Sequence, residues 1–310
     1  MPTRALGASG LTVSRLALGS WRTFERISRE DGVAVMVAAR EAGITFLDDA
    51  RYNDETGTAP QATGYSEVVF GELFRAAGWP REHTVVANKL WWEFWPEQTA
   101  AQELDASLTR MKLDHVDLIY AETPPEGLDV AGAVEQIIGL IDAGKARAWG
   151  VLNWTGDQVL EAARIADMQG LPGPAAAQLP YSLVRREVVE DDHLIRSLAA
   201  ANTVVVASYA LAGGVLTGKY DKTDAGRHPD ALTDPRLAAA VKAGRDLAAF
   251  AAELGVEPAP LAMAFTLLNP AVASLLFGAT RPEQVERDLA AVELAENLDE
   301  DAVARLRAIG

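Results

Sequence analysis

Short apolar runs alternate with longer segments of helical periodicity along the whole sequence, and this alternation is the strongest constraint on the fold. Eight runs rich in β-branched and apolar residues are predicted strands. They span residues 15–19, 45–49, 84–90, 116–121, 146–152, 175–179, 203–209 and 274–278. The helices predicted to follow them span residues 29–42, 66–77, 96–111, 130–143, 156–168, 191–201, 234–254 and 282–292. Such an alternation is typical of α/β proteins with a parallel sheet.

Two α/β architectures fit this pattern, a closed (β/α)₈ barrel and a doubly wound open sheet. The open sheet normally carries a glycine-rich nucleotide turn after its first strand, whereas residues 19–23 (GSWRT) lack the G-x-G-x-x-G pattern. Eight strand–helix units in 310 residues match the barrel in number and length. We therefore predict a single (β/α)₈ TIM-barrel domain over residues 1–310, with extra helices at 260–268 and 299–309. The irregular stretch at 216–233 is predicted to be functional or mobile.

Composition excludes several classes of function. The chain carries 28 Lys and Arg against 44 Asp and Glu, a formal net charge of −16, whereas nucleic acids and anionic membranes require a basic surface. The absence of cysteine excludes disulfides, thiolate metal sites and a cysteine nucleophile. The four histidines lack metal-ligand spacing, so no metal is predicted. Because the start has no signal-peptide pattern and no apolar run could span a bilayer, we expect a cytoplasmic protein.

The working residues of such a barrel lie at the carboxyl ends of its strands and in the loops that follow. The polar and aromatic residues there are Gly19, Trp21, Asp48, Asp49, Tyr52, Lys89, Trp91, Trp92, Trp95, Tyr120, Glu122, Asn153, Trp154, Gln178, Tyr181, Ser208 and Tyr209. A lysine can lower the pKa of a neighbouring phenol, and a carboxylate can hold the lysine in place. We expect Tyr52, assisted by Lys89 and Asp48, to donate a proton to a carbonyl oxygen, although each residue type also occurs in structural roles.

Residues 91–95 (WWEFW) place three tryptophans and a phenylalanine in one strand-to-helix loop. Such a cluster can wall a pocket for a bulky apolar substrate, or it can form a contact between subunits. Because the loop directly follows Lys89, we favour the pocket, lined by Trp21, Trp91 and Trp92.

Eight short motifs follow one another along the chain. They are residues 6–14 (LGASGLTVS), 43–48 (GITFLD), 85–89 (VVANK), 116–122 (VDLIYAE), 150–153 (GVLN), 177–181 (AQLPY), 211–220 (LAGGVLTGKY) and 278–284 (GATRPEQ). In this order they resemble the motifs of the aldo-keto reductases, (β/α)₈ enzymes that use a nicotinamide cofactor. The resemblance covers nearly the whole chain, and it implies an N-terminal β-hairpin and an NADPH-dependent oxidoreductase.

The resemblance also implies roles for individual residues. The catalytic positions fall on Asp48, Tyr52, Lys89 and Glu122. Tyr181 is expected to stack on the nicotinamide ring, while Asn153 and Gln178 hold its carboxamide. Thr280 and Arg281 fall where family members bind the 2′-phosphate, and an arginine suits that dianion, so NADPH is favoured over NADH. The other expected cofactor contacts are Ser208, Leu211, Gly214, Lys219, Gly278, Gln284 and Asp288.

Three positions depart from the family pattern. Glu122 replaces the usual histidine, and a glutamate donates a hydrogen bond to substrate only when protonated; the family's steroid 5β-reductases carry the same change and reduce a conjugated C=C bond. The family tyrosine lies five residues after the aspartate, where this chain has Asn53. Tyr52 lies one residue early and Tyr65 follows an insertion at 54–64; we favour Tyr52 as the donor. Leu152 replaces a serine and Asp288 an asparagine, both expected to loosen cofactor binding.

Three functions are compatible with these features. The first is a reductase that transfers hydride to a carbonyl, or to a C=C or C=N bond conjugated to one, in a bulky, partly apolar small molecule. The second is a catalytically weak regulatory barrel that binds the cofactor, like the potassium-channel β-subunits. The third is a redox-neutral epimerase or isomerase with a retained cofactor. The presence of Asp48, Lys89 and Tyr52 favours the first, and the missing histidine keeps the second open.

Overall fold

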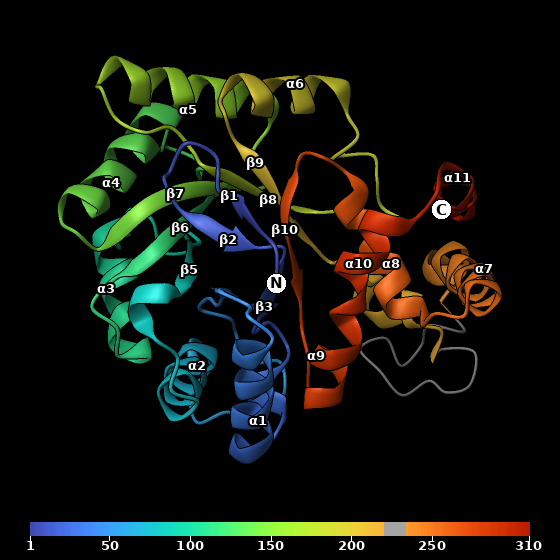
Figure 1. Ribbon diagram of the computed structural model, residues 1–310. Coiled ribbons are helices and arrows are strands. Elements are labelled where there is room, and N and C mark those ends of the chain that lie inside the picture. The colour runs from blue at the N-terminus through green and yellow to red at the C-terminus, as the bar shows by residue number, and fades with distance from the viewer. Residues whose placement is uncertain (220–233) are drawn as a thin grey trace.

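A computed structural model of the chain shows eight parallel strands that close into a barrel (Figure 1). The structure describes residues 1–219 and 234–310, so residues 220–233 of the irregular stretch expected at 216–233 lie outside the described residues. The barrel strands are β3 (Leu16–Gly19), β4 (Phe46–Asp48), β5 (Val85–Leu90), β6 (Val116–Glu122), β7 (Ala146–Leu152), β8 (Ala176–Pro180), β9 (Val204–Ser208) and β10 (Val272–Phe277). Strand β10 pairs with β3 and completes the ring. The predicted (β/α)₈ barrel is confirmed.

Alternate residues of the strands fill the barrel interior. Phe46, Val85 and Leu118 belong to one buried apolar cluster, and Phe46 of β4 pairs with Val85 of β5. Side chains alternate between the two faces of a strand, so positions two and four residues further on point into the same interior. Asp48 follows Phe46 by two residues and Lys89 follows Val85 by four, which brings both to the inner mouth at the carboxyl ends.

A β-hairpin covers the amino end of the barrel (Figure 1). It consists of β1 (Thr3–Ala5) and β2 (Thr12–Ser14), which pair antiparallel, as the family resemblance predicted. Leu6 and Val13 are fully buried and belong to the inner apolar cluster. Gly7 adopts a left-handed φ of +52°, and a Cβ there would lie 2.4 Å from the carbonyl oxygen of Ala175. The hairpin therefore closes the amino end of the barrel tightly.

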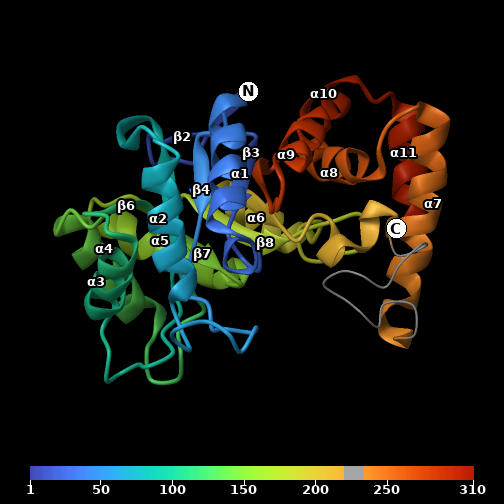
Figure 2. The same cartoon turned by 90° about the horizontal axis from the view of Figure 1, so that it is seen from below.

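Helices surround the barrel in two groups. The outer layer consists of α1 (Arg29–Glu41), α2 (Tyr65–Ala76), α3 (Ala100–Met111), α4 (Val130–Asp142), α5 (Gly156–Met168) and α6 (Asp192–Ala200) (Figure 1). Figure 2 shows the second group on one side of the barrel: α7 (Ala238–Leu254), α8 (Pro258–Leu268), α9 (Pro282–Asp288), α10 (Ala290–Asn297) and α11 (Glu300–Ile309). Short 3₁₀ turns are η1 (Phe24–Arg26), η2 (Arg81–His83), η3 (Ala212–Thr217) and η5 (Pro235–Leu237).

Three helix predictions differ from the structure by more than two residues. Helix α7 begins at Ala238 rather than at residue 234, because the 3₁₀ turn η5 precedes it. Helix α3 begins at Ala100 rather than at residue 96, because the Thr99 side chain accepts a hydrogen bond from the Gln102 backbone and Gln102 caps Thr99 in return. The helix predicted over 282–292 is two helices, α9 and α10, which meet at Leu289. Within the described residues, no single helix is long and apolar enough to cross a membrane; a bent pair, Pro235–Leu254 with Pro258–Leu268, meets the criteria of length and composition together.

Candidate active site

Three side chains meet on the floor of the barrel mouth. The Lys89 ammonium forms an ion pair with Oδ1 of Asp48, and its Nζ donates a hydrogen bond to the Tyr52 hydroxyl oxygen over 3.3 Å. The other oxygen of Asp48 accepts a hydrogen bond of 2.9 Å from Nε2 of Gln178. Asp48 and Lys89 are each 3% exposed, so water screens their attraction weakly. The structure thus brings together Asp48, Tyr52, Lys89 and Gln178.

Tyr52 is the tyrosine beside this pair. Tyr65 instead begins helix α2, where its hydroxyl oxygen accepts a hydrogen bond of 2.9 Å from Arg29. Burial raises the pKa of Tyr52 well above its ordinary value, and the carboxylates of Asp48 and Asp49 raise that pKa further. The expectation that Lys89 lowers the pKa of Tyr52 therefore fails for the protein alone, because burial and the neighbouring negative charges dominate. The phenol stays protonated at neutral pH and retains a proton to donate.

A cleft of about 920 Å³ opens above this cluster at the carboxyl end of the barrel. The predicted site residues that line it are Trp21, Asp48, Tyr52, Lys89, Trp91, Asn153, Gln178, Ser208, Leu211, Gly214, Lys219, Gly278, Thr280 and Gln284. The Trp91 ring lies 6.2 Å from the Tyr52 ring, at an angle of 58°. The cleft therefore has a polar floor with an aromatic wall directly beside the candidate proton donor.

Besides Arg281, which lines a neighbouring cavity described below, four predicted residues do not line this cleft in the part of the chain that the structure describes. Tyr181 is 1% exposed, its hydroxyl donates to Glu190 over 2.8 Å, and its ring packs 6.0 Å from that of Phe265. It is therefore held beneath the surface of the cleft and cannot stack on a ligand there. Trp92 is 3% exposed and packs edge-on against Trp95, so it supports the wall rather than forming it.

Glu122 and Asp288 are the other two. Oε1 of Glu122 accepts a hydrogen bond of 2.8 Å from the Thr123 backbone, and Oε2 accepts one of 2.9 Å from Nδ2 of Asn153. Both oxygens therefore act as acceptors, which does not match the donor role expected for a protonated glutamate. Asp288 is 1% exposed and pairs with Arg287. It is Arg287, rather than Asp288, that reaches the cleft.

The lining residues without a predicted role include four arginines, Arg22, Arg26, Arg185 and Arg287, and Tyr209, which was expected only at a strand end. Tyr209 directly follows Ser208 at the end of β9, and Arg22 directly follows Trp21. Both have a left-handed backbone, with φ of 61° for Tyr209 and 54° for Arg22. Asn153, at the end of β7, has a φ of 62°. Such conformations are costly for residues with a Cβ, and they concentrate at functional sites.

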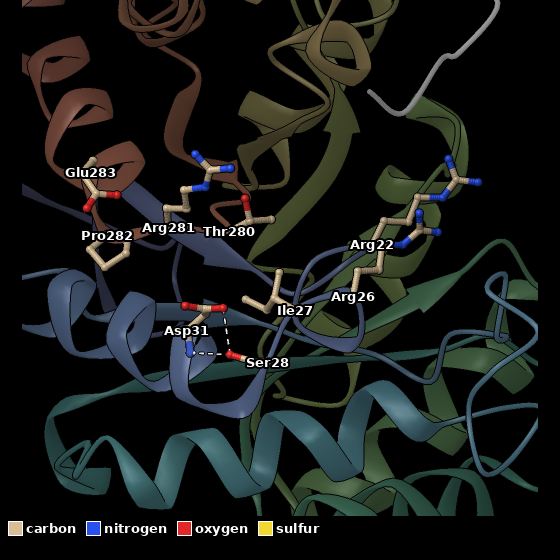
Figure 3. Close-up of a pocket in the computed structure, with 9 residues that line it drawn as sticks. All are labelled: Arg22, Arg26, Ile27, Ser28, Asp31, Thr280, Arg281, Pro282 and Glu283. Carbon is tan, nitrogen blue, oxygen red and sulfur yellow. Dashed lines mark hydrogen bonds between the residues drawn. The ribbon is translucent and has the colours of Figure 1, made fainter. Parts of the chain in front are cut away.

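A second cavity, of about 600 Å³, lies next to the cleft (Figure 3). Arg22 and Arg26 come from the segment after β3, while Thr280 and Arg281 come from the segment after β10. Arg22 and Arg26 line both cavities, and both pair with the same carboxylate oxygen of Glu55. Arg281 thus lies apart from the aromatic wall, in a cavity with three arginines.

Within the described residues, no group of three or more His, Asp or Glu is placed to hold a metal ion. The arrangement instead suits acid–base chemistry, because a protonated phenol, an ammonium and a carboxylate share one buried network. Amide and hydroxyl groups along the cleft can hold a polar ligand in one orientation.

Comparison with known proteins identifies the family. The sequence profile of the Aldo/keto reductase family matches residues 15–310. A protein from Oryza sativa subsp. japonica named "Probable voltage-gated potassium channel subunit beta" is 31% identical over 332 residues, covering 100% of this chain and 96% of that protein. One of the same name from Arabidopsis thaliana is 31% identical over 317 residues, covering 95% of this chain and 92% of that protein. The chain therefore belongs to the aldo/keto reductase family.

Proposed function

We propose that the protein is an NADPH-dependent oxidoreductase that transfers hydride to a carbonyl group, or to a C=C or C=N bond conjugated to one. Its proposed substrate is a bulky, partly apolar small molecule, and its proposed location is the cytoplasm. The observation that carries the proposal is the Tyr52–Lys89–Asp48 cluster, which lies beneath a cleft walled by Trp21 and Trp91.

The charges of the cleft fit an anionic cofactor. The chain has a net charge of −16, yet the cleft is lined by six Lys or Arg side chains and by one carboxylate, that of Asp48. Asp48 pairs with Lys89, whereas the carboxylates of Glu55 and Asp288, which pair with Arg22, Arg26 and Arg287, do not line the cleft. Cationic side chains in a concave surface attract phosphates. This contrast with the rest of the chain favours a dinucleotide with several phosphate groups.

The segment after β9 supports the same assignment. Gly213 and Gly214 have left-handed φ values of 67° and 93°, and a Cβ on Gly214 would lie 3.1 Å from the Lys219 ammonium nitrogen. Glycine at this position lets a ligand approach the backbone closely. We infer that Lys219 and Arg287 hold the phosphate groups that bridge the two nucleosides, and that Thr280 and Arg281 hold the 2′-phosphate. Asn153 and Gln178 would then hold the carboxamide.

The bound nicotinamide supplies the hydride. The residues of this chain supply the proton and the place for the substrate. Tyr52 donates its proton to the substrate oxygen, and the Lys89 ammonium stabilises the phenolate that remains. Asp48 keeps Lys89 beside the phenol oxygen throughout. Trp21 and Trp91 exclude water and provide an apolar surface for the substrate.

A single turnover experiment tests this function. Purified protein is mixed with NADPH and a panel of aldehydes, ketones, enones and imines, and the absorbance of the reduced nicotinamide is followed. We expect oxidation of NADPH with at least one class of substrate, and the product identifies which bond is reduced. Tight binding of NADPH without oxidation by any member of the panel would exclude the reductase in favour of the second candidate.

That second candidate is a regulatory barrel that binds the cofactor and turns over weakly. It is favoured by the names of the two plant relatives, both potassium channel β subunits, and by Glu122 in place of the usual histidine. Under this alternative, a partner protein would respond to the bound cofactor. Co-purification with a potassium channel, lost on cofactor oxidation while the turnover assay stays negative, would support it.

A further inference from the structure

Glu103 is a buried carboxyl group with no part in the proton transfer described above. It lies in the first turn of α3 and is 3% exposed. Its oxygens accept hydrogen bonds from the backbone N–H groups of Trp91, at 2.9 Å, and Trp92, at 3.2 Å. These two residues directly follow β5, the strand that carries Lys89. Hydrogen bonds to a carboxylate are stronger than those between neutral groups, so one side chain ties this loop to α3.

The backbone held by Glu103 is an unusual one. Trp92 has a left-handed φ of 58°, which a bulky residue adopts only when its surroundings impose it. Its indole nitrogen donates a hydrogen bond of 2.9 Å to the carbonyl oxygen of Glu122 at the end of β6. The Trp91 backbone just before this turn also donates its N–H to Glu103. The position of the Trp91 ring therefore depends on a backbone that the Glu103 carboxylate stabilises.

The same carboxylate faces Arg51, the residue before Tyr52. Nη2 of Arg51 lies 3.8 Å from Glu103 and 2.6 Å from Glu93, while Nη1 donates a hydrogen bond of 3.0 Å to Thr63. Arg51 is 6% exposed. An uncompensated charge at such a depth is costly, so the arginine and the carboxylate stabilise each other. Glu103 thus connects the segment that carries Tyr52 with the segment that follows Lys89.

We propose that Glu103 is a positioning residue for the candidate active site. Its carboxylate holds the Trp91 ring against Tyr52 and fixes the distance between the Tyr52 hydroxyl and the Lys89 ammonium. The kinetic part of this inference rests on the proposed hydride transfer. The position of Trp91 does not rest on it, because that position can be measured in the absence of turnover.

The first measurement is the accessibility of Trp91. Acrylamide quenching is recorded for the protein and for its Trp91→Phe counterpart, and the difference gives the signal of Trp91 alone. The same two proteins are prepared again with the substitution Glu103→Gln. The glutamine side chain has one oxygen in place of two, so it can accept from only one of the two backbone N–H groups and places its own NH₂ group against the other. Asp105→Asn is the matched control, since Asp105 lies on the same helix but pairs with Lys145 on the surface. We expect Trp91 to become more quenchable in the Glu103 variant and not in the control; equal quenching in all three overturns the proposal.

The second measurement separates positioning from general loss of structure. With the substrate found in the turnover experiment, Glu103→Gln should lower kcat/KM by roughly 10- to 100-fold, as misplacement of reacting groups does, while NADPH affinity stays unchanged. Glu103→Asp keeps the charge and both acceptors on a shorter arm and should recover part of the activity. Equal losses of NADPH affinity and kcat/KM would show a general structural role and overturn the proposal. If the wild type shows no turnover, the proposed function fails, whereas the quenching result still decides the role of Glu103.

Discussion

At the scale of single residues, Asp48 fixes the positions of the Lys89 and Gln178 side chains, because each of its two carboxylate oxygens contacts one of them. One pairs with the Lys89 ammonium and the other accepts from the Gln178 amide. The ammonium is thereby held 3.3 Å from the Tyr52 oxygen. The negative charge of Asp48 raises the pKa of Tyr52, after the larger effect of burial. The result is a phenol that keeps its proton until a substrate accepts it.

Tyr52→Phe should abolish turnover and leave NADPH affinity nearly unchanged, because the hydroxyl acts on the substrate. Tyr65→Phe is the matched control, since that hydroxyl contacts Arg29 outside the cleft. Because the pKa of Tyr52 is raised, kcat/KM for reduction should show no loss from this group until the pH exceeds about 10. An inactive Tyr65→Phe beside an active Tyr52→Phe would reverse the assignment.

Arg281→Ala should weaken NADPH binding far more than NADH binding. The loss of a hydrogen bond to a charged group costs about 1.5–3 kcal/mol, and only NADPH carries the 2′-phosphate. Dissociation constants for both cofactors, measured by quenching of protein fluorescence, provide the comparison. An equal loss for NADPH and NADH would remove Arg281 from this role.

Glu122→Gln should retain most of the activity, because a glutamine oxygen can still accept the hydrogen bond from Asn153. Glu122→Ala removes that acceptor and should lower NADPH affinity by releasing the Asn153 side chain. The dependence of kcat/KM on pH distinguishes this role from proton donation. A fall at high pH that is present in the wild type and absent in Glu122→Gln would restore Glu122 as a donor. Glu122→His then tests the expected preference for conjugated C=C bonds, which should shift toward simple ketones.

At the scale of helices and strands, the sequence pattern predicted every barrel strand because each contains a short run of apolar residues bounded by turn signals. The predicted start of α3 was wrong because proline is common in the first turn of a helix, which favoured Pro96, whereas the cap that forms is between Thr99 and Gln102. Local propensity also gave no sign that a helix would divide at Leu289. Such boundaries depend on packing against other elements, which the pattern of one segment does not contain.

The candidate site was predictable to the extent that it follows strand geometry. Asp48, Lys89 and Gln178 point into the barrel mouth because they keep the alternation of the apolar residues before them. Tyr181 and Trp92 were predicted to line the cleft but do not, because they lie in loops. In a loop, a motif gives the position of a residue along the chain but not the direction of its side chain. Arg22 and Arg26 were missed for the same reason, since they follow β3 in the segment that contains η1, whereas Arg287 reaches the cleft from helix α9.

The packing of α2 on α3 gives a prediction at this scale. A Cβ on Gly71 of α2 would lie 2.1 Å from the carbonyl oxygen of Met111 at the end of α3. Gly71→Ala should therefore destabilise the fold by about 1–3 kcal/mol, as overpacking does. Gly139→Ala in α4 is the control: no atom lies within 4 Å of the new Cβ, so the helix should gain about 0.5–1 kcal/mol. Urea unfolding measures both, and equal stabilities would contradict the close approach of the two helices.

At the scale of the whole molecule, the distribution of charge places several Lys and Arg side chains around the cleft. The chain has a net charge of −16, yet its cleft is lined by six Lys or Arg side chains and one carboxylate. An anionic ligand is repelled by the net charge and attracted to the cleft and to the arginines of the neighbouring cavity. Salt screens both effects, so the contrast diminishes as ionic strength rises.

The stability of the whole fold should depend on Asp288. Burial raises the pKa of this carboxyl to about 6, and its Oδ2 has no hydrogen-bond partner. The folded state therefore binds the proton more tightly than the unfolded state, so this contribution is present below about pH 4 and is lost as pH rises through about 6. A shift of about two pKa units corresponds to roughly 3 kcal/mol. Asp288→Asn should flatten the decline in the free energy of unfolding over this range, and an unchanged decline would contradict the assignment.

The seam between β10 and β3 has a consequence for how the molecule is made. Leu275 pairs with Leu16, and the Arg15 guanidinium donates to carbonyl oxygens of Leu267 and Ala273, so the ring is closed by residues from opposite ends of the chain. Pairings this distant in sequence form slowly, because a long loop must be ordered first. During synthesis, strands β3 to β9 emerge before their last neighbour exists, and the open edges of β3 and β9 stay exposed to other chains. We therefore expect the nascent chain to aggregate more readily before β10 has left the ribosome than after it.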